Sequence, residues 1–466
     1  MMPGPSYCWW MRLRLMLLVV TMIMSTPALH VQAVLSEPAH QAAHAHAQQP
    51  ANAPLPQACA SDLDCSLNGV CNPVSKRCDC DVEWSGMSLN GSCSAMAFQG
   101  AAFPLGYGMH PRLNATWGGG AIMDPATGKF HLYVSDMAGG GYLRGWRTES
   151  QVVHAVADTP VGPYTRVGIA ITKWAHNPAP ITVPQSMGGG FAIFHIGGGG
   201  GPPPQPAPLG LGPFAPVPTA PASATAMATR NASFAVATAG HGGHGSYRGA
   251  SIHVAPALGG PWTPLQNSRL PSCNNPGPAV HPNGTVYCVC GGALLRLVGP
   301  ALSGGAWVNA GSVPALGEDQ DLSFDHRGNW HILYHSFDRR STIVKGNTVG
   351  CASNNTVSAH VFSADGQHWR VGLEQPYTPH IAMAAGGTTT VSTRERPKVL
   401  RDSTGRATHL FNGVSSAANC TKAQCAPHSV ACDNCKYGTW TYTLVLAFKK
   451  TPATPTLSSA STQVPP

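Results

Sequence analysis

Short runs of alternating hydrophobic and polar residues, each bounded by glycine or proline, recur along the chain from about Trp117. A period of two is typical of β-strands with one buried face. Each run follows a turn-rich segment and begins at or near a glycine. The clearest runs lie at 128–133, 190–195, 284–288, 328–334 and 405–411.

Each of these runs belongs to a larger unit that repeats along the chain. The units begin at 117–121, 176–180, 274–278, 318–322 and 394–398, and third strands follow at 153–156, 251–255 and 359–362. Each third strand leads to a glycine-containing turn that ends on an aromatic residue, as in Gly162-Pro163-Tyr164. Repeats of several short strands are typical of propeller blades, which bury their faces by stacking around an axis. The pattern therefore predicts an all-β protein with a five-bladed β-propeller over 106–449. Gly- and Pro-rich residues 196–230 lack periodicity and are expected to be a disordered insertion.

The N-terminus has the order of a secretory signal. Arg12 and Arg14 precede an apolar run from Leu15 to Met24, and small residues follow near Ala33. We therefore expect a signal peptide at 1–33, a flexible linker at 34–58 and a disordered tail at 450–466. A signal anchor is the alternative, although the run is short for a membrane span. Secretion to the extracellular space also fits the N-glycosylation sequons at Asn90, Asn114, Asn231, Asn283, Asn354 and Asn419.

Composition narrows the choice of partners. The formal net charge is +8, but the basic residues are dispersed rather than clustered. Nucleic-acid binding would need a basic stripe, so we expect no nucleic-acid partner. We also expect no stable membrane insertion after signal cleavage and no cofactor. The sequence gives no indication of the oligomeric state.

Cysteines divide the chain into two regions. Of the 15 cysteines, Cys8 would leave with the signal, and secretion favours disulfides over free thiols among the rest. The first six, with Cys78-Asp79-Cys80 and a longer final loop, resemble the epidermal-growth-factor-like (EGF-like) family over 59–93. The resemblance implies disulfides Cys59–Cys71, Cys65–Cys78 and Cys80–Cys93. We expect the module to be a structural spacer rather than a receptor ligand. No acidic cluster precedes Cys59, so we expect no calcium site. A zinc site would require reduced thiolates, which secretion disfavours.

The later cysteines allow several pairings. Eight of them could form four disulfides: Cys273, Cys288, Cys290, Cys351, Cys420, Cys425, Cys432 and Cys435. The last four lie close together in sequence, which is compatible with either two disulfides or a four-thiolate zinc site. Secretion favours the disulfides, and the pairing stays open.

The five strand starts and the Gly-Pro-Trp turns resemble those of the five-bladed glycoside hydrolase clan of arabinanases, xylosidases and invertases (family 43 and relatives). This resemblance spans roughly 106–448 and implies carboxylates at the starts of the innermost strands, facing an axial cleft. Asp319 and Glu395 occupy such positions and are the candidate acid/base pair. Candidate substrate-binding residues are Trp117, His176, Asn177, Arg394 and Arg396.

One departure from the family keeps a second function open. The first unit begins with Trp117-Gly118-Gly119, where active family members have an aspartate. A non-catalytic propeller that binds sugar or protein is therefore the alternative to a glycosidase. At the level of single residues, Trp117 could be core rather than a sugar platform, and Glu395 could be a structural ion-pair partner between Arg394 and Arg396. Strand histidines such as His131, His331 and His335 could be satisfied core residues.

Overall fold

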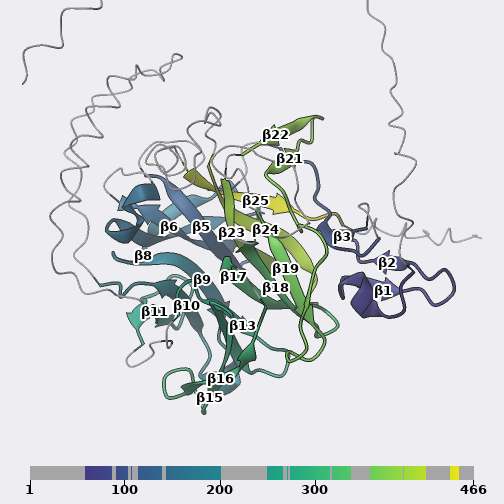
Figure 1. The fold of residues 1–466 in the computed structure, drawn as a ribbon. Helices are drawn as coiled ribbons and strands as arrows, with labels where there is room; N and C mark the ends of the chain where they lie inside the picture. The colour runs from purple at the N-terminus through teal and green to yellow at the C-terminus, as the bar shows by residue number, and fades with distance from the viewer. Residues whose placement is uncertain are drawn as a thin grey trace, which may run out of the picture. The chain divides into compact units, whose positions relative to one another are not determined.

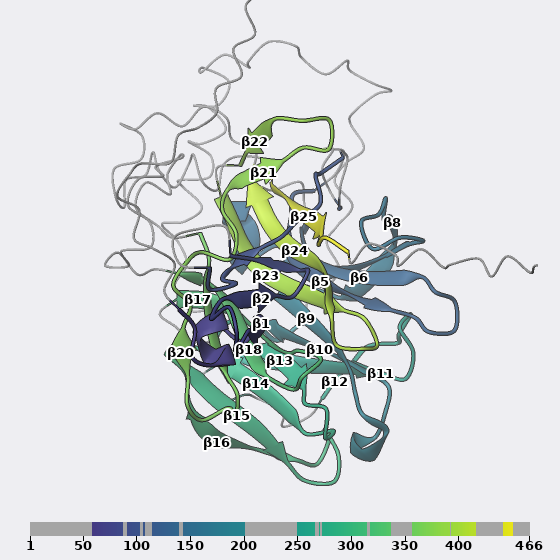
Figure 2. The ribbon, with the colours of Figure 1, turned by 90° about the vertical axis from the view of Figure 1, so that its right-hand side faces the viewer.

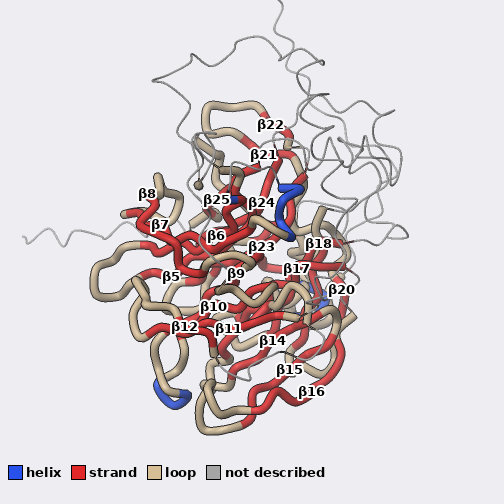
Figure 3. The backbone as a smooth tube through the Cα atoms, turned by 90° about the vertical axis from the view of Figure 1, so that its left-hand side faces the viewer, coloured by secondary structure: helices blue, strands red, loops and turns tan. Residues whose placement is uncertain are grey.

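The computed structural model describes residues 58–86, 91–102, 106–107, 114–138, 143–200, 249–265, 270, 273–314, 317–336, 357–391, 393–415 and 441–450. Most regular structure in these ranges is β-strand (Figure 3). The helical segments are short 3-10 turns at Asp62–Cys65, Leu143–Arg147 and Gln185–Met187. Within the same ranges, no helix is long and apolar enough to cross a membrane.

Five antiparallel sheets form the blades, and each is ordered from the inside outwards as in the sequence (Figure 1). Blade 1 contains β5 (Thr116–Met123), β6 (Phe130–Met137), β7 (Ser150–Ala157) and β8 (Thr165–Ile171). Blade 2 contains β9 (His176–Thr182), β10 (Phe191–Ile196), β11 (Ala250–Ala255) and β12 (Thr263–Pro264). Blade 3 contains β13 (Gly277–Val280), β14 (Val286–Cys290), β15 (Ala293–Val298) and β16 (Ala306–Ser312). Blade 4 contains β17 (Gly317–Phe324), β18 (Trp330–Ser336), β19 (Ala359–Ser363) and β20 (Arg370–Val371). Blade 5 contains β23 (Thr393–Arg401), β24 (Ala407–Ser415) and β25 (Thr441–Ala447).

The innermost strands close a ring. β5 contacts β9, β9 contacts β13, β13 contacts β17, β17 contacts β23, and β23 returns to β5 (Figure 2). The hydrophobic clusters lie between neighbouring blades: Phe194 and Ile252 of blade 2, for example, pack against Val286 and Leu295 of blade 3. Each blade therefore buries its faces against the next, which confirms the five-bladed propeller expected from the repeats.

The insertion expected at 196–230 begins later than the sequence suggested. Ile196 is the last residue of β10, and the Gly199 amide donates a hydrogen bond to the Trp174 carbonyl at 2.9 Å. The glycine run therefore continues the edge of blade 2 as far as Gly200. Residues 201–230 lie outside the described residues, as do the expected signal peptide and nearly all of the expected linker and C-terminal tail.

The N-terminal disulfide-rich module has β1 (Gly69–Cys71) paired with β2 (Cys78–Cys80), and β3 (Trp84–Ser85) paired with β4 (Ala95–Met96). Its disulfides are Cys59–Cys71, Cys65–Cys78 and Cys80–Cys93, the pairing that the resemblance implied. The module is small, and these bonds add stability that its core cannot supply.

The module is docked on the propeller rather than held apart from it, which corrects the spacer interpretation. The Arg327 guanidinium donates to both Asp81 carboxylate oxygens, at 3.1 and 2.5 Å, and to the Leu67 carbonyl at 2.7 Å. The Trp84 ring stacks on His360 of β19 with a centroid distance of 5.2 Å. Bidentate pairing of this kind fixes orientation as well as distance.

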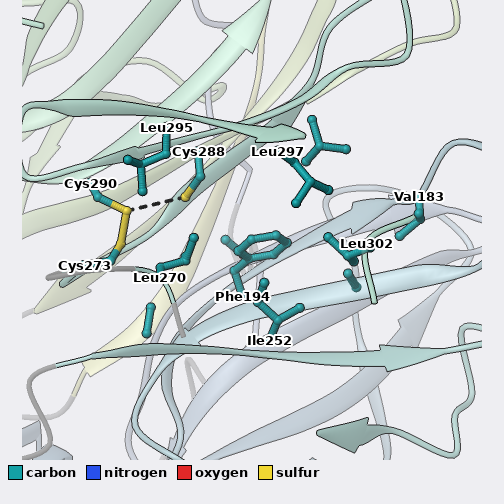
Figure 4. Close-up of a cluster of buried hydrophobic side chains, with 14 residues drawn as sticks. Val183, Phe194, Ile252, Leu270, Cys273, Cys288, Cys290, Leu295, Leu297 and Leu302 are labelled. Carbon is teal, nitrogen blue, oxygen red and sulfur yellow. Dashed lines mark hydrogen bonds between the residues drawn. A yellow bond between two sulfur atoms is a disulfide. The ribbon is translucent and has the colours of Figure 1, made fainter. Parts of the chain in front are cut away.

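A fourth disulfide, Cys273–Cys290, lies in the core between blades 2 and 3 (Figure 4). Cys288 is a free, fully buried thiol whose Sγ lies 3.6 Å from Cys290 Sγ. Of the pairings that the sequence left open, the structure therefore shows Cys273–Cys290, and Cys288 stays a free thiol. The remaining cysteines of that group lie outside the described residues.

We expect the Cys288 thiol to be inert in the folded protein. It has no exposed surface, and burial raises its pKa well above the usual range, so the reactive thiolate is suppressed. Maleimide labelling of the Cys288 peptide, followed by mass spectrometry at neutral pH, should be at least about a hundredfold slower in the native protein than in guanidinium. Equal labelling rates in the two conditions would show that this core is open.

Candidate functional site

The start of each innermost strand contains a residue in the left-handed backbone region. The φ angles are 60° at Gly118, 55° at Asn177, 58° at Asn275, 63° at Asp319 and 59° at Arg396. In blades 1, 2, 4 and 5 the strand pairing shifts register at the same place, as expected for β-bulges. Glycine, asparagine and aspartate tolerate this conformation, whereas arginine adopts it at a cost that its surroundings must offset.

These five residues, which we call the axial floor, meet at the propeller axis. The Arg396 guanidinium donates to the Asp319 carboxylate and, at 2.7 Å, to Asn275 Oδ1. Asn177 Nδ2 donates to the same Asn275 oxygen at 3.1 Å. A Cβ on Gly118 would lie 2.8 Å from Arg396 Cβ, so blade 1 contributes space rather than a side chain. The Arg396 side chain therefore occupies the space beside Gly118, where blade 1 lacks the aspartate expected from the family.

Carboxylates gather beside the floor in what we call the axial carboxylate cluster, formed by Glu318, Asp319, His335 and Glu395. Each contributes a ligand-type atom, and these atoms all lie within 4.8 Å of one another. His335 of β18 lies between the two glutamates, with Nδ1 3.6 Å from Glu318 Oε1 and Nε2 3.9 Å from Glu395 Oε1. The Glu318 side chain is 34% exposed, whereas those of Asp319 and Glu395 are 0% and 7% exposed. Glu318 is therefore the most accessible acid.

The environment separates the acidities of two neighbouring carboxyls. Burial raises the pKa of Asp319 to about 7, against the opposing charge of Arg396, and the nearby Glu318 and Glu395 add to the rise. Burial alone would raise the pKa of Glu318, but the hydrogen bond with His335 and the charge of Arg396 outweigh it and hold that pKa below its usual value. Divergent acidities of adjacent carboxyls are a common feature of acid/base sites.

The same four side chains could hold a divalent cation. Carboxylate oxygens and an imidazole nitrogen are suitable ligands, and Asp319 Oδ2 is a buried acceptor with no hydrogen-bond partner among the described residues. The sequence did not suggest a metal site, because Glu318 and His335 come from different strands of blade 4.

Two of the expected substrate-binding residues lie elsewhere. Trp117 is 1% exposed and packs with Ala115 and Met137, so its ring is part of the core and offers no open face. Arg394 lies between the Phe98 and Tyr377 rings, at 5.4 and 4.4 Å.

Arg394 also donates through Nε to Asn412 Oδ1 at 2.9 Å and through Nη1 to the Thr378 carbonyl at 2.8 Å. Arg394 therefore joins blade 5 to flanking segments and does not face the cluster. Side chains at successive strand positions point to opposite faces, so the neighbours Arg394 and Glu395 separate.

The other expected residues lie at the site. Asp319, Asn177 and Arg396 form part of the floor, and Glu395 lies in the cluster. His176 is buried beside blade 1, where Nδ1 lies 2.8 Å from Ser150 Oγ, and Nε2 has no hydrogen-bond partner within the part of the chain that the structure describes. Burial holds the pKa of His176 well below the usual value, so its ring is neutral.

At the start of the blade 4 unit, which contains Glu318, Asp319 and Asp321, sequence reasoning chose Asp319 rather than Glu318, and it left His335 as a possible core residue. Glu318 and Glu395 occupy the same place, one residue before the left-handed residue of their strands. That shared offset is the signal that could have paired them. His335 carries no such signal, since it looks like any strand histidine.

Fold and site together define a five-bladed propeller with a carboxylate-rich axial site. No family model matches the chain, and no curated protein matches it. Similar solved structures include a family GH43 β-1,3-galactosidase, at TM-score 0.38 and 10% identity over 72% of this chain and 57% of that chain.

Two other similar structures are hydrolases from named organisms. One is the Podospora anserina α-L-arabinofuranosidase in complex with cellotriose, at TM-score 0.39 and 9% identity over 77% of this chain and 96% of that chain. The other is a family 117 glycoside hydrolase of Zobellia galactanivorans, at TM-score 0.38 and 12% identity over 79% of this chain and 91% of that chain. Values this low carry no inference about activity, which is argued below from the side chains of this chain.

Proposed function

We propose that this protein is a secreted carbohydrate-active enzyme that hydrolyses glycosidic bonds at the axial carboxylate cluster. The observation that supports this most is the meeting of Glu318 and Glu395, from two different blades, around His335. Glycoside hydrolysis needs one carboxyl to protonate the leaving oxygen and another to attack the sugar or activate water. A pair brought together from blades 4 and 5 meets that requirement.

Spacing and burial suggest a role for each group. Carboxyls about 5 Å apart are typical of retaining enzymes, in which one of them is the nucleophile. Glu318 is the more exposed of the two, and its pKa is held below the usual value, so we assign it as nucleophile and Glu395 as proton donor. Asp319, expected from the sequence to be one of the pair, lies beneath them against Arg396 and holds the floor in place. The exposed Asn274 offers hydrogen bonds to sugar hydroxyls.

Secretion is part of the proposal. The expected signal peptide would route the chain to an oxidising compartment, where disulfides form and persist. Four disulfides in the described residues are consistent with that route. We further propose that the N-terminal module is EGF-like, since its disulfide pairing is the one that family uses.

One observation favours a second function, sugar binding without cleavage. Blade 1 supplies Gly118 and Gly119 where a carboxylate would be expected, and Asp319 is held by Arg396. The remaining groups could then hold a sugar by hydrogen bonds alone.

A screen distinguishes the two functions. Purified full-length protein would be incubated with arabinan, xylan, fructan and galactan, with reducing ends measured over time and binding measured by calorimetry. Product from any one of them supports hydrolysis. Binding without product from all four would replace the enzyme proposal with the binding one, and neither binding nor product would contradict both.

A further inference from the structure

A cavity of about 210 Å³ lies on the axis, on the side of the floor away from Glu318 and Glu395. Each innermost strand continues past its floor residue and contributes to the wall, through Gly120, Ala179, Pro278, Asp321 and Lys398. Further along, Ile181, Val280 and Leu400 are partly exposed, so the cavity opens to solvent. We call it the lower axial cavity.

Polar groups in the wall come from β17 and β23. Lys398 Nζ lies 3.4 Å from Asp321 Oδ1 and donates to the Gln320 carbonyl at 3.3 Å. The other Asp321 oxygen accepts the Val399 amide at 2.8 Å. Arg401 donates through Nη2 to Ser323 Oγ at 3.0 Å and through Nη1 to the Gly405 carbonyl at 2.8 Å.

Unused hydrogen-bond donors remain in the wall. Lys398 has three N–H groups and two acceptors, Asp321 Oδ1 and the Gln320 carbonyl, and each Asp321 oxygen already contacts one donor. Arg401 Nε is a buried donor with no partner among the described residues, and the Ser323 hydroxyl hydrogen is available because its oxygen accepts from Arg401. Buried donors without acceptors are costly, so a ligand that supplies acceptors would be favoured.

Charge and size restrict the ligand further. Two cations and one carboxylate line the cavity, which favours an anion. Carboxylates fit a guanidinium edge such as the one at Arg401 Nε. The cavity is smaller than the roughly 300–1,000 Å³ typical of drug-sized ligands. We propose that the lower axial cavity is a second ligand site, separate from the axial carboxylate cluster, for a small carboxylate-bearing molecule about the size of one sugar acid.

Calorimetric titration of the full-length protein at constant ionic strength tests this site. Galacturonate is the probe, galactose is its neutral counterpart, and inorganic phosphate is the competing anion. We expect galacturonate to bind and galactose to bind at least about tenfold more weakly, because a charge-assisted hydrogen bond contributes about 1.5–3 kcal/mol. Equal binding of galactose, or binding of phosphate alone, would overturn the proposal.

Variants locate the site. Arg401→Gln should weaken galacturonate binding about tenfold or more. Ser323→Ala should weaken it severalfold, and this variant tests the site even if Arg401→Gln fails to fold. Arg406→Gln is the matched control, because Arg406 faces Glu83 of the N-terminal module, at 3.5 Å, and does not line the cavity.

Glu395→Gln distinguishes this site from the axial carboxylate cluster and should leave the affinity unchanged. Loss of binding in Glu395→Gln with retention in Ser323→Ala would place the ligand at the cluster and overturn the second site, whatever the outcome for hydrolysis.

Discussion

Hydrolysis by the Glu395→Gln variant is expected to fall by about a thousandfold, with the fold intact. The substitution keeps the size of a side chain that is 7% exposed, but it removes the proton that the leaving oxygen needs. Initial rates on whichever polysaccharide the screen identifies, measured alongside circular dichroism, give the comparison. Residual activity above about a tenth of wild type would show that another group donates the proton.

Matched variants separate chemistry from general damage. Glu318→Gln should lose activity to a similar extent, and added azide should partly restore Glu318→Ala by acting as a replacement nucleophile. Asp158→Asn is the control, because Asp158 has an 84% exposed side chain paired only with Lys129 at the surface. A glycosyl azide of inverted configuration is expected from Glu318→Ala, and one of retained configuration from that variant would reverse the two roles.

The propeller could be predicted because its signals are local. Period-two alternation bounded by glycine or proline repeats from blade to blade, and each unit carries this pattern whatever its neighbours are. The strand starts were found in the same way, which is why Asn177, Asp319, Glu395 and Arg396 were placed at the axis.

The orientation of single side chains at those strand starts could not be predicted. The left-handed residue in each bulge interrupts the alternation of side chains between the two faces of the strand. Neighbours such as Glu318 and Asp319 therefore do not point to the faces that a regular strand would give them. Trp117 and Arg394 were misassigned because the sequence does not show which residues cover their side chains. The rings that cover Arg394 come from Phe98 and Tyr377, which lie outside the blades and outside any repeat.

Buried histidine pairs give the second large prediction. Blades 1, 2 and 4 each join their second and third strands through His131–His154, His195–His253 and His331–His360, with ring nitrogens 2.9, 2.9 and 3.0 Å apart. A pair this close cannot carry two protons without strong repulsion. Two of the strand histidines that the sequence left as possible core residues, His131 and His331, thus belong to a buried pair that repeats in three blades.

These pairs are expected to make the protein acid-labile. Burial lowers the pKa of His154 and His253 to about 4 and that of His195 to about 3, and it lowers the pKa of His360 well below its usual value. The unfolded chain binds protons below about pH 6.5, whereas the folded chain does not until its lower pKa values are reached.

The free energy of unfolding should therefore fall as the pH drops from about 6.5 towards 4, by about 1.4 kcal/mol per pH unit for each such histidine. Four of them together lose about 5 kcal/mol per unit, against a typical total of about 5–15 kcal/mol. The raised pKa values of the buried Asp319, Asp136 and Asp321 oppose this loss, because the folded chain holds protons that the unfolded chain releases. Asp319, with a pKa of about 7, offsets about one proton over this range.

Urea unfolding midpoints at pH 7, 6, 5 and 4 would measure the slope. His253→Gln should reduce the slope by about one proton, because the unfolded chain then has one fewer imidazole to protonate. His368→Gln is the control, since the His368 side chain is 89% exposed and contacts only the nearby Asp365 carboxylate. A slope unaffected by His253→Gln would mean that carboxylates, rather than these pairs, set the acid limit. A midpoint constant from pH 7 to 4 would show that the folded chain takes up protons at the pairs as readily as the unfolded chain does.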